Sequence, residues 1–144
     1  MKIAIINGPN LNLLGKRETD IYGNKTFDSY LLSLKKQFPQ YEIAFFQSNI
    51  EGELIDKIQE YGLEKRIILL NAGGYTHTSV SITDAIHAIS ALGSAVIEIH
   101  ISQIAAREEF RHTSLIGSAC IGSICGFGLD SYRLGLLAAE NLHR

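Results

Sequence analysis

The sequence predicts an α/β fold in which a parallel sheet is covered by helices on both faces. Short runs rich in branched apolar residues alternate with longer segments whose apolar residues recur every three or four positions. This alternation is typical of parallel sheets, because two parallel strands need a crossover connection between them. The 144 residues contain no linker, repeat or low-complexity segment. We therefore expect residues 1–144 to form a single domain.

The first half of the chain supplies three expected strands and two helices. Lys2–Asn7 is an isoleucine-rich run that ends in the turn signature Asn-Gly-Pro-Asn, in which Gly8 permits unusual dihedral angles. Apolar residues at helical spacing predict a helix that stops at Pro39. The next helix is expected to have Gly62 as its C-terminal cap. The expected ranges are helices 26–38 and 50–62 and strands 41–48 and 66–70.

The second half continues the alternation. A glycine-rich loop precedes a helix that we expect to end at Gly93. In the last helix, the spacing of Leu134, Leu137 and Ala138 predicts that they face inward. The expected ranges are loop 71–78, helix 81–92, strand Ala95–His100, a short helical turn 104–110, strand 119–125 and helix 129–142.

Composition excludes several classes of function. The formal net charge of −2 gives no reason to expect nucleic acid or an anionic membrane as a partner. No apolar run is long enough to span a bilayer, and the N-terminal run is too short for a signal peptide. Cys120 and Cys125 lie in an apolar stretch and lack zinc-type spacing with histidines, which is typical of reduced thiols in a cytoplasmic protein.

Ligands of parallel sheets bind beyond the carboxyl ends of the strands, so three loops are candidates for a site. They span residues 7–23, 71–78 and 100–111. The first loop is long for a compact domain and is polar without low complexity, which favours an active-site lid. The second contains adjacent glycines that would let backbone approach an anion, although an ordinary loop explains them equally well.

Glu98 and His100 are the strongest candidates for acid–base chemistry. They are two positions apart on an expected strand and therefore point to the same face. A carboxylate beside a histidine fixes its tautomer and stabilises its protonated form. The alternative is that Glu98 pairs with a basic residue and His100 is structural. A glutamate in an otherwise apolar strand needs a partner, and the histidine supplies one.

Arg17 and Tyr22 form a second suggestive pair within the first loop. A free tyrosine has a pKa of about 10 and is a poor base near neutral pH. An arginine beside the phenol would favour the phenolate. From the residues alone, packing remains the more usual role of such a tyrosine. The sequence lacks the glycine-rich dinucleotide and phosphate motifs, the nucleophile elbow of serine hydrolases and the metal-binding spacing of histidines.

Five motifs taken together strongly resemble the type II 3-dehydroquinate dehydratases. The match runs almost from end to end and reaches all three candidate loops. The motifs are INGPNLNLLGKRE at 6–18, YG at 22–23, NAGGYTHTS at 71–79, EIHIS at 98–102 and REEFRH at 107–112. The resemblance implies a flavodoxin-like sandwich with a five-stranded parallel sheet in the order 2-1-3-4-5. It also implies trans-elimination of water from 3-dehydroquinate to give 3-dehydroshikimate in the shikimate pathway, with no metal and no organic cofactor. The family assembles as trimers, commonly four of them in a dodecamer.

The resemblance also implies catalytic roles for five residues. Tyr22 is expected to remove a proton from C2, next to the ketone, and Arg17 to hold Tyr22 as phenolate. Asn10 is expected to position a water that stabilises the enolate. His100, oriented by Glu98, is expected to protonate the departing C1 hydroxyl. These tasks match the chemistry, because an enolate needs polar stabilisation and hydroxide needs a proton donor.

Six further residues are implied in substrate binding. Ile101 and Ser102 are expected to bind the carboxylate through backbone N–H groups and the serine hydroxyl. Asp84 resembles a residue that reaches the site of a neighbouring subunit. The expected ligands of the ring hydroxyls are Asn71, His77 and Arg111.

The chain departs from the family pattern at a few positions without losing a proposed catalytic group. Thr19 and Ala72 stand where proline is usual, Thr83 where arginine is common, and Gln103 where asparagine is usual. The main alternative is a flavin- or nucleotide-binding module of the same fold, which should have a hydroxyl- and glycine-rich phosphate loop after the first strand. A signalling receiver domain would need acidic residues at the end of the first strand. The barrel-forming dehydroquinase class needs about 250 residues.

Overall fold

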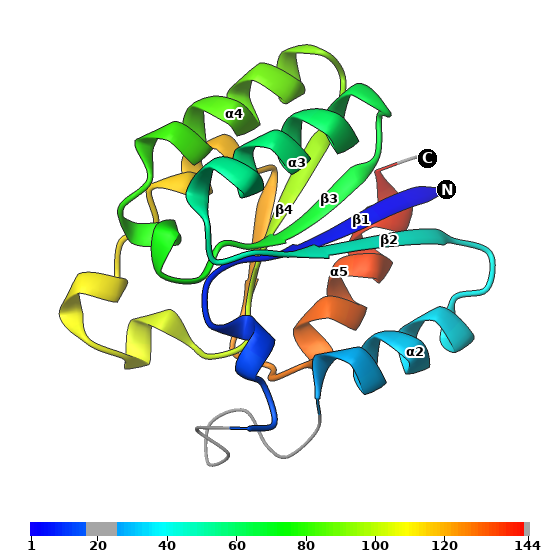
Figure 1. Cartoon of the computed structure of the whole chain (residues 1–144), viewed down its shortest axis with the longest axis horizontal. Coiled ribbons are helices and arrows are strands. Elements are labelled where there is room, and N and C mark those ends of the chain that lie inside the picture. The colour runs from blue at the N-terminus through cyan, green and yellow to red at the C-terminus, as the bar shows by residue number, and fades with distance from the viewer. Residues whose placement is uncertain (17–25, 143–144) are drawn as a thin grey trace.

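A five-stranded parallel sheet forms the centre of the computed structural model, which describes residues 1–16 and 26–142 (Figure 1). Its strand order is β2-β1-β3-β4-β5, and every neighbouring pair is parallel. This order confirms the flavodoxin-like prediction. The strands are β1 (Lys2–Asn7), β2 (Glu42–Gln47), β3 (Ile67–Asn71), β4 (Ala95–His100) and β5 (Gly122–Cys125).

Helices cover both faces of the sheet (Figure 1), and among the described residues two of them pack on each face. Successive side chains of a strand point to opposite faces. In β1, Ile3 and Ile5 therefore pack toward α2 and α5, whereas Ala4 and Ile6 pack toward α3 and α4, all four being fully buried. The helices are α2 (Phe27–Gln37), α3 (Glu51–Leu63), α4 (Val80–Ala91) and α5 (Asp130–Asn141).

In the described part of the chain, five short 3₁₀ helices occupy the connections, and most lie near the carboxyl ends of the strands. The segments that follow β1, β3 and β4 gather at this edge in Figure 1, where the strand arrowheads point. The 3₁₀ helices are η1 (Leu11–Leu13), η2 (Gly73–His77), η3 (Ile104–Ala106), η4 (Glu109–Arg111) and η5 (Ile116–Ala119). The expected helical turn at 104–110 is thus two separate turns, and the expected strand 119–125 starts only at Gly122.

Helix ends agree with the sequence at several positions but not at Gly62. Gly93 has φ of 91° and follows Leu92, the C-cap of α4, as expected of a C-terminal glycine. Gly62 instead lies inside α3, which continues to Leu63. A Cβ at Gly62 would lie 2.4 Å from Cγ2 of Ile89. This glycine is therefore needed for the close approach of α3 and α4, and its prediction as a cap was wrong.

The buried face of α5 also differs from the predicted one. Leu137 is exposed, and Leu134 and Ala138 are only half-buried. The helix instead packs through Tyr132 and Gly135, together with Leu136 and Ala139. A Cβ at Gly135 would lie 3.0 Å from side-chain atoms of Ile99 and Leu69, so this glycine lets the helix lie close to the sheet.

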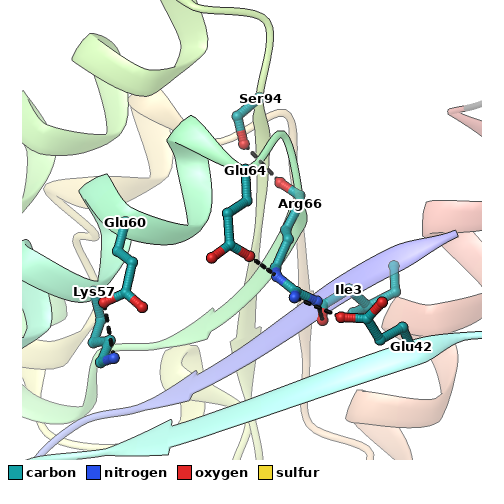
Figure 2. A network of polar contacts seen from close by, with 7 residues as sticks. All are labelled: Ile3, Glu42, Lys57, Glu60, Glu64, Arg66 and Ser94. Carbon is teal, nitrogen blue, oxygen red and sulfur yellow. Dashed lines mark hydrogen bonds and ion pairs between the residues drawn. The ribbon is translucent and has the colours of Figure 1, made fainter.

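Arg66 joins the amino ends of three strands (Figure 2). This end of the sheet is opposite to the carboxyl ends of the strands, where the connecting loops gather. Its guanidinium donates to Glu42 Oε1 at 2.6 Å, to Glu64 Oε2 at 2.5 Å and to the carbonyl of Ile3 at 3.4 Å. Its own carbonyl accepts from the hydroxyl of Ser94 at 2.6 Å. This cluster ties β1 and β2 to the turn between α3 and β3 and to the residue that precedes β4.

Candidate active site

A pocket of about 210 Å³ lies beyond the carboxyl ends of β1, β3 and β4. This is the edge at which parallel sheets bind ligands, as predicted. The last residues of β3 and β4 and the loops that follow the three strands contribute all of its described lining. Seven residues predicted from the sequence are among those that line it: Asn10, Asn71, His77, His100, Ile101, Ser102 and Arg111.

The loops after β1 and β3 fit against each other through two glycines. The Gly8 N–H donates to the carbonyl of Asn71 at 2.7 Å, and a Cβ at Gly8 would lie 2.5 Å from the Ala72 carbonyl oxygen. Gly73 has φ of 59°, and its Cβ would lie 3.1 Å from the Pro9 carbonyl oxygen. Gly8 is therefore required for the close approach of backbone rather than for a positive φ, which it does not adopt.

The backbone N–H groups directly after β1 form hydrogen bonds within the protein. Asn10 adopts a left-handed conformation with φ of 70°, which asparagine tolerates, and its N–H donates to Asn49 Oδ1 at 3.0 Å. The N–H of Leu11 donates to the carbonyl of Gly8 at 3.4 Å, and Pro9 has no N–H. The start of this loop, residues 8–11, therefore offers none of the free amide donors that a phosphate-binding loop requires.

Glu98 and His100 lie on one face of β4 and form a hydrogen-bonded pair. The His100 Nε2–H donates to Glu98 Oε2 at 2.8 Å. Both side chains are buried, with Glu98 only 2% exposed. Because Nε2 is engaged, Nδ1 is the ring nitrogen of His100 that is left for a ligand in the pocket. The predicted juxtaposition of the carboxylate and the histidine is confirmed.

Two serines complete the surroundings of the Glu98 carboxylate. Ser114 donates to Oε2 at 2.5 Å, and Ser123 donates to Oε1 at 2.6 Å. Burial alone would raise the pKa of Glu98, but the hydrogen bonds from His100 and the two serines lower it below the usual glutamate value. Glu98 is thus held as a carboxylate beside the histidine.

Asn71 is fixed by a buried tyrosine from α5. Asn71 Nδ2 donates to the Tyr132 hydroxyl at 3.0 Å, and that hydroxyl donates to Asn7 Oδ1 at 2.7 Å. The Gly73 N–H donates to Asn71 Oδ1 at 3.2 Å. These contacts set the direction of the amide and leave one of its two N–H groups for a ligand.

The remaining polar lining is positively charged or neutral. His77 bonds the carbonyl of Thr113 through Nδ1 at 2.8 Å, and its ring centroid lies 6.5 Å from that of His100. Arg107 and Arg111 also line the pocket. Among the described residues, no Asp or Glu contributes to the lining. Such a pocket favours an anionic ligand that carries groups able to hydrogen-bond.

The other predicted residues lie elsewhere or outside the described part of the chain. Glu98 lies behind His100 rather than in the lining. Asp84 is exposed on α4 and does not line the pocket of its own chain. Arg17 and Tyr22 fall within residues 17–25, outside the described residues, so their pairing stays a prediction.

Sequence reasoning missed four residues that the structure brings to the site. Arg107 stands in the REEFRH motif, where its type and loop position could have marked it as an anion ligand. Ser114, Ser123 and Tyr132 act behind the pocket and carry no recognisable local pattern. The register of β5 reveals Ser123 and the packing of α5 reveals Tyr132, whereas Ser114 is placed by the segment that leads into η5.

Two classes of feature are absent from residues 1–16 and 26–142. No three side chains of histidine, cysteine, aspartate or glutamate converge there as metal ligands would. No helix there has both the length and the apolar character to cross a bilayer. Cys120 and Cys125 are both free, and burial raises the pKa of Cys120 to about 12.

A family model described as dehydroquinase class II matches residues 1–140. The chain belongs to this family. Curated relatives named 3-dehydroquinate dehydratase include a protein of Caldicellulosiruptor bescii, 49% identical over 144 residues that cover 98% of this chain and 97% of the relative. A relative of the same name from Rhizobium etli is 50% identical over 142 residues, covering 97% of this chain and 96% of the relative.

Solved structures of the family have the same fold. The type II dehydroquinase of Butyrivibrio crossotus superposes with a TM-score of 0.89 at 43% identity, over 94% of each chain. That of Propionibacterium acnes superposes with a TM-score of 0.90 at 34% identity, over 96% of this chain and 94% of the other. Four of the five motifs that suggested the family contribute residues to the described lining of the pocket, and the fifth, at 22–23, lies outside the described residues.

Proposed function

We propose that this protein is a 3-dehydroquinate dehydratase, which eliminates water from 3-dehydroquinate to give 3-dehydroshikimate. The elimination proceeds through an enolate and serves the shikimate pathway toward aromatic amino acids. The single observation that carries the proposal is the Glu98–His100 pair at 2.8 Å, in the pocket of a chain that belongs to the class II dehydroquinases. The pair supplies the proton donor that a hydroxide leaving group needs.

The substrate suits the electrostatics of the pocket. 3-Dehydroquinate carries a carboxylate, a ketone and several hydroxyls. We assign the carboxylate to the backbone N–H of Ile101 and the hydroxyl and N–H of Ser102, which follow β4 directly. The ring hydroxyls are assigned to side chains that have donors or acceptors to spare, namely Asn71, His77 and Arg111.

Five residues carry the chemistry in this proposal. Tyr22, held as phenolate by Arg17, removes the C2 proton beside the ketone. Asn10, at the rim of the pocket, positions a water against the developing enolate oxygen. His100 then delivers a proton to the C1 hydroxyl as the carbon–oxygen bond breaks, and Glu98 stabilises the imidazolium that precedes this transfer.

The assembly and cellular location follow the family. We propose trimers, four of which form a dodecamer in the cytoplasm, with Asp84 reaching the site of a neighbouring subunit. The exposure of Asp84 on α4 suits such a contact, since the side chain is free to meet another chain. Sedimentation velocity of the purified protein measures the subunit count directly.

A direct assay tests the function. Purified protein mixed with 3-dehydroquinate should increase ultraviolet absorbance, because the product has a carbon–carbon double bond conjugated to a carbonyl group. His100→Ala should lower kcat by about 10²- to 10⁴-fold, the usual contribution of a general acid. Wild-type protein that produces no absorbance change would refute the proposal.

The alternative of a flavin- or nucleotide-binding module is tested on the same preparation. Such a module should bind FMN or a nucleotide with an affinity measurable by fluorescence or calorimetry. We expect no binding, because the backbone N–H groups of Gly8, Asn10 and Leu11 are already bonded within the protein.

A further inference from the structure

The carboxylate of Glu98 has three donors around it, and two of them come from residues outside the pocket lining. His100 and Ser114 donate to Oε2 at 2.8 and 2.5 Å, and Ser123 donates to Oε1 at 2.6 Å. Glu98 is 2% exposed, so these donors replace water as its solvation. Both of its oxygens are therefore bonded to protein groups.

The direction of the Ser114 hydroxyl is fixed by the backbone of η5. The N–H of Gly117 donates to Ser114 Oγ at 3.0 Å, which leaves the hydroxyl proton for Glu98. A Cβ at Gly117 would lie 3.0 Å from Glu98 Oε1 and 3.1 Å from Ser114 Oγ. The glycine thus allows η5 to close over the carboxylate and to orient the donor.

Ser123 reaches the carboxylate from the edge of the sheet. It is the register partner of Glu98 in the parallel β4–β5 ladder, so the two side chains emerge on the same face. Unlike Glu98, it is exposed on its strand. Water can therefore replace its hydroxyl more easily than that of Ser114, which is half-buried.

We propose that Ser114 and Ser123 are positioning residues, which hold Glu98 in the orientation that binds His100 Nε2 and leaves Nδ1 facing the leaving hydroxyl of the substrate. The part of this proposal that concerns the leaving hydroxyl rests on the proposed function. The arrangement of the four side chains is independent of it and is present in the protein without substrate. Loss of the serine donors frees the carboxylate to turn, and the imidazole then loses its single tautomer.

Steady-state kinetics of alanine variants measure the effect on turnover. Ser114→Ala should lower kcat about tenfold with KM changed less than about twofold, because the substrate contacts remain. Ser123→Ala should lower kcat about threefold, since water substitutes for the hydroxyl. Ser123→Thr, which keeps the hydroxyl on a strand that favours β-branched residues, should restore wild-type kcat.

Ser118→Ala is the matched control. Ser118 lies in η5 on the same segment, is exposed, and donates to the carbonyl of Leu115 at 3.3 Å rather than to Glu98. Its kcat and KM should equal those of the wild type. The acidic limb of the pH–rate profile should move to higher pH in Ser114→Ala and stay in place in Ser118→Ala, because lost hydrogen bonds raise the pKa of Glu98.

Nitrogen-15 NMR of the free protein separates this inference from the proposed function. The His100 signals, assigned by their loss in His100→Asn, should show the proton on Nε2 in the wild type and a mixture of tautomers in the double variant Ser114→Ala/Ser123→Ala. An unchanged tautomer in a folded double variant, or a kcat loss equal to that of Ser118→Ala, would overturn the positioning role. Inactive wild-type protein would overturn only the function.

Discussion

Alanine at Gly8 is the sharpest test of how the pocket is built. The added Cβ would lie 2.5 Å from the carbonyl oxygen of Ala72 and 2.6 Å from its carbonyl carbon. An ordinary non-bonded contact is about 3.5 Å, so the loops after β1 and β3 must separate by about 1 Å. Both clashing atoms belong to backbone, and no rotamer change relieves them.

Stability and turnover should both fall in Gly8→Ala. Overpacking of this kind costs about 1–3 kcal/mol in the free energy of unfolding. For a chain of this length the loss corresponds to a decrease in Tm of roughly 3 to 10 °C. Because Pro9 and Asn10 move with the loop, kcat/KM for 3-dehydroquinate should fall about 10²-fold, as expected for a 1 Å misplacement of catalytic groups.

Gly52→Ala is the control, measured by thermal unfolding and by the same ultraviolet assay. Gly52 lies in α3, and an added Cβ there meets no atom within 4 Å. This variant should keep full activity and gain up to about 1 kcal/mol from the higher helix propensity of alanine. Equal Tm and equal kcat/KM in Gly8→Ala and Gly52→Ala would refute the close-approach argument.

Three further predictions concern individual side chains. Tyr22→Phe should abolish turnover while calorimetry shows substrate binding largely intact, and near-normal turnover would refute its assignment as the base. Tyr132→Phe should raise KM and cost about 1–2 kcal/mol in urea unfolding, because Asn71 and Asn7 lose their shared partner; an unchanged KM would contradict the role of this tyrosine. The pKa of Glu98 is lowered from 4.5 by folding, so its contribution to stability is complete above pH 4.5 and is lost as pH falls through the folded value. The free energy of unfolding should therefore vary less between pH 3 and 6 in Glu98→Gln than in the wild type, and equal slopes would argue against this linkage.

Local pattern was sufficient to predict most elements and the central pair of the site. The strand periodicity of two predicts that Glu98 and His100 lie on one face, and the hydrogen bond between them is consistent with that placement. Parallel topology placed the loops of Asn71 and Arg111 at one edge of the sheet. The roles assigned to individual residues rested on family resemblance, which spacing alone does not supply.

The errors arise where distant segments decide the outcome. Glycine is typical of a helix cap, but at Gly62 the close contact with Ile89 of α4 is the reason that a glycine is needed. The apolar face of α5 was misassigned because Tyr132 and Gly135 pack on the sheet in place of Leu137. Which residues of a helix are buried depends on how their side chains fit the packed surface opposite, and local sequence pattern does not specify that surface.

The cluster around Arg66 has a practical consequence for engineering the protein. It holds β1, β2 and the start of β3 together at the end of the sheet that does not carry the pocket (Figure 2). Substitutions meant to raise heat resistance belong at that end, where stiffening the backbone leaves the substrate-facing loops free to adjust. Substitutions meant to change substrate specificity belong at the pocket end of the sheet. Because the two ends are far apart, the effects of stabilising and specificity-changing substitutions should be additive.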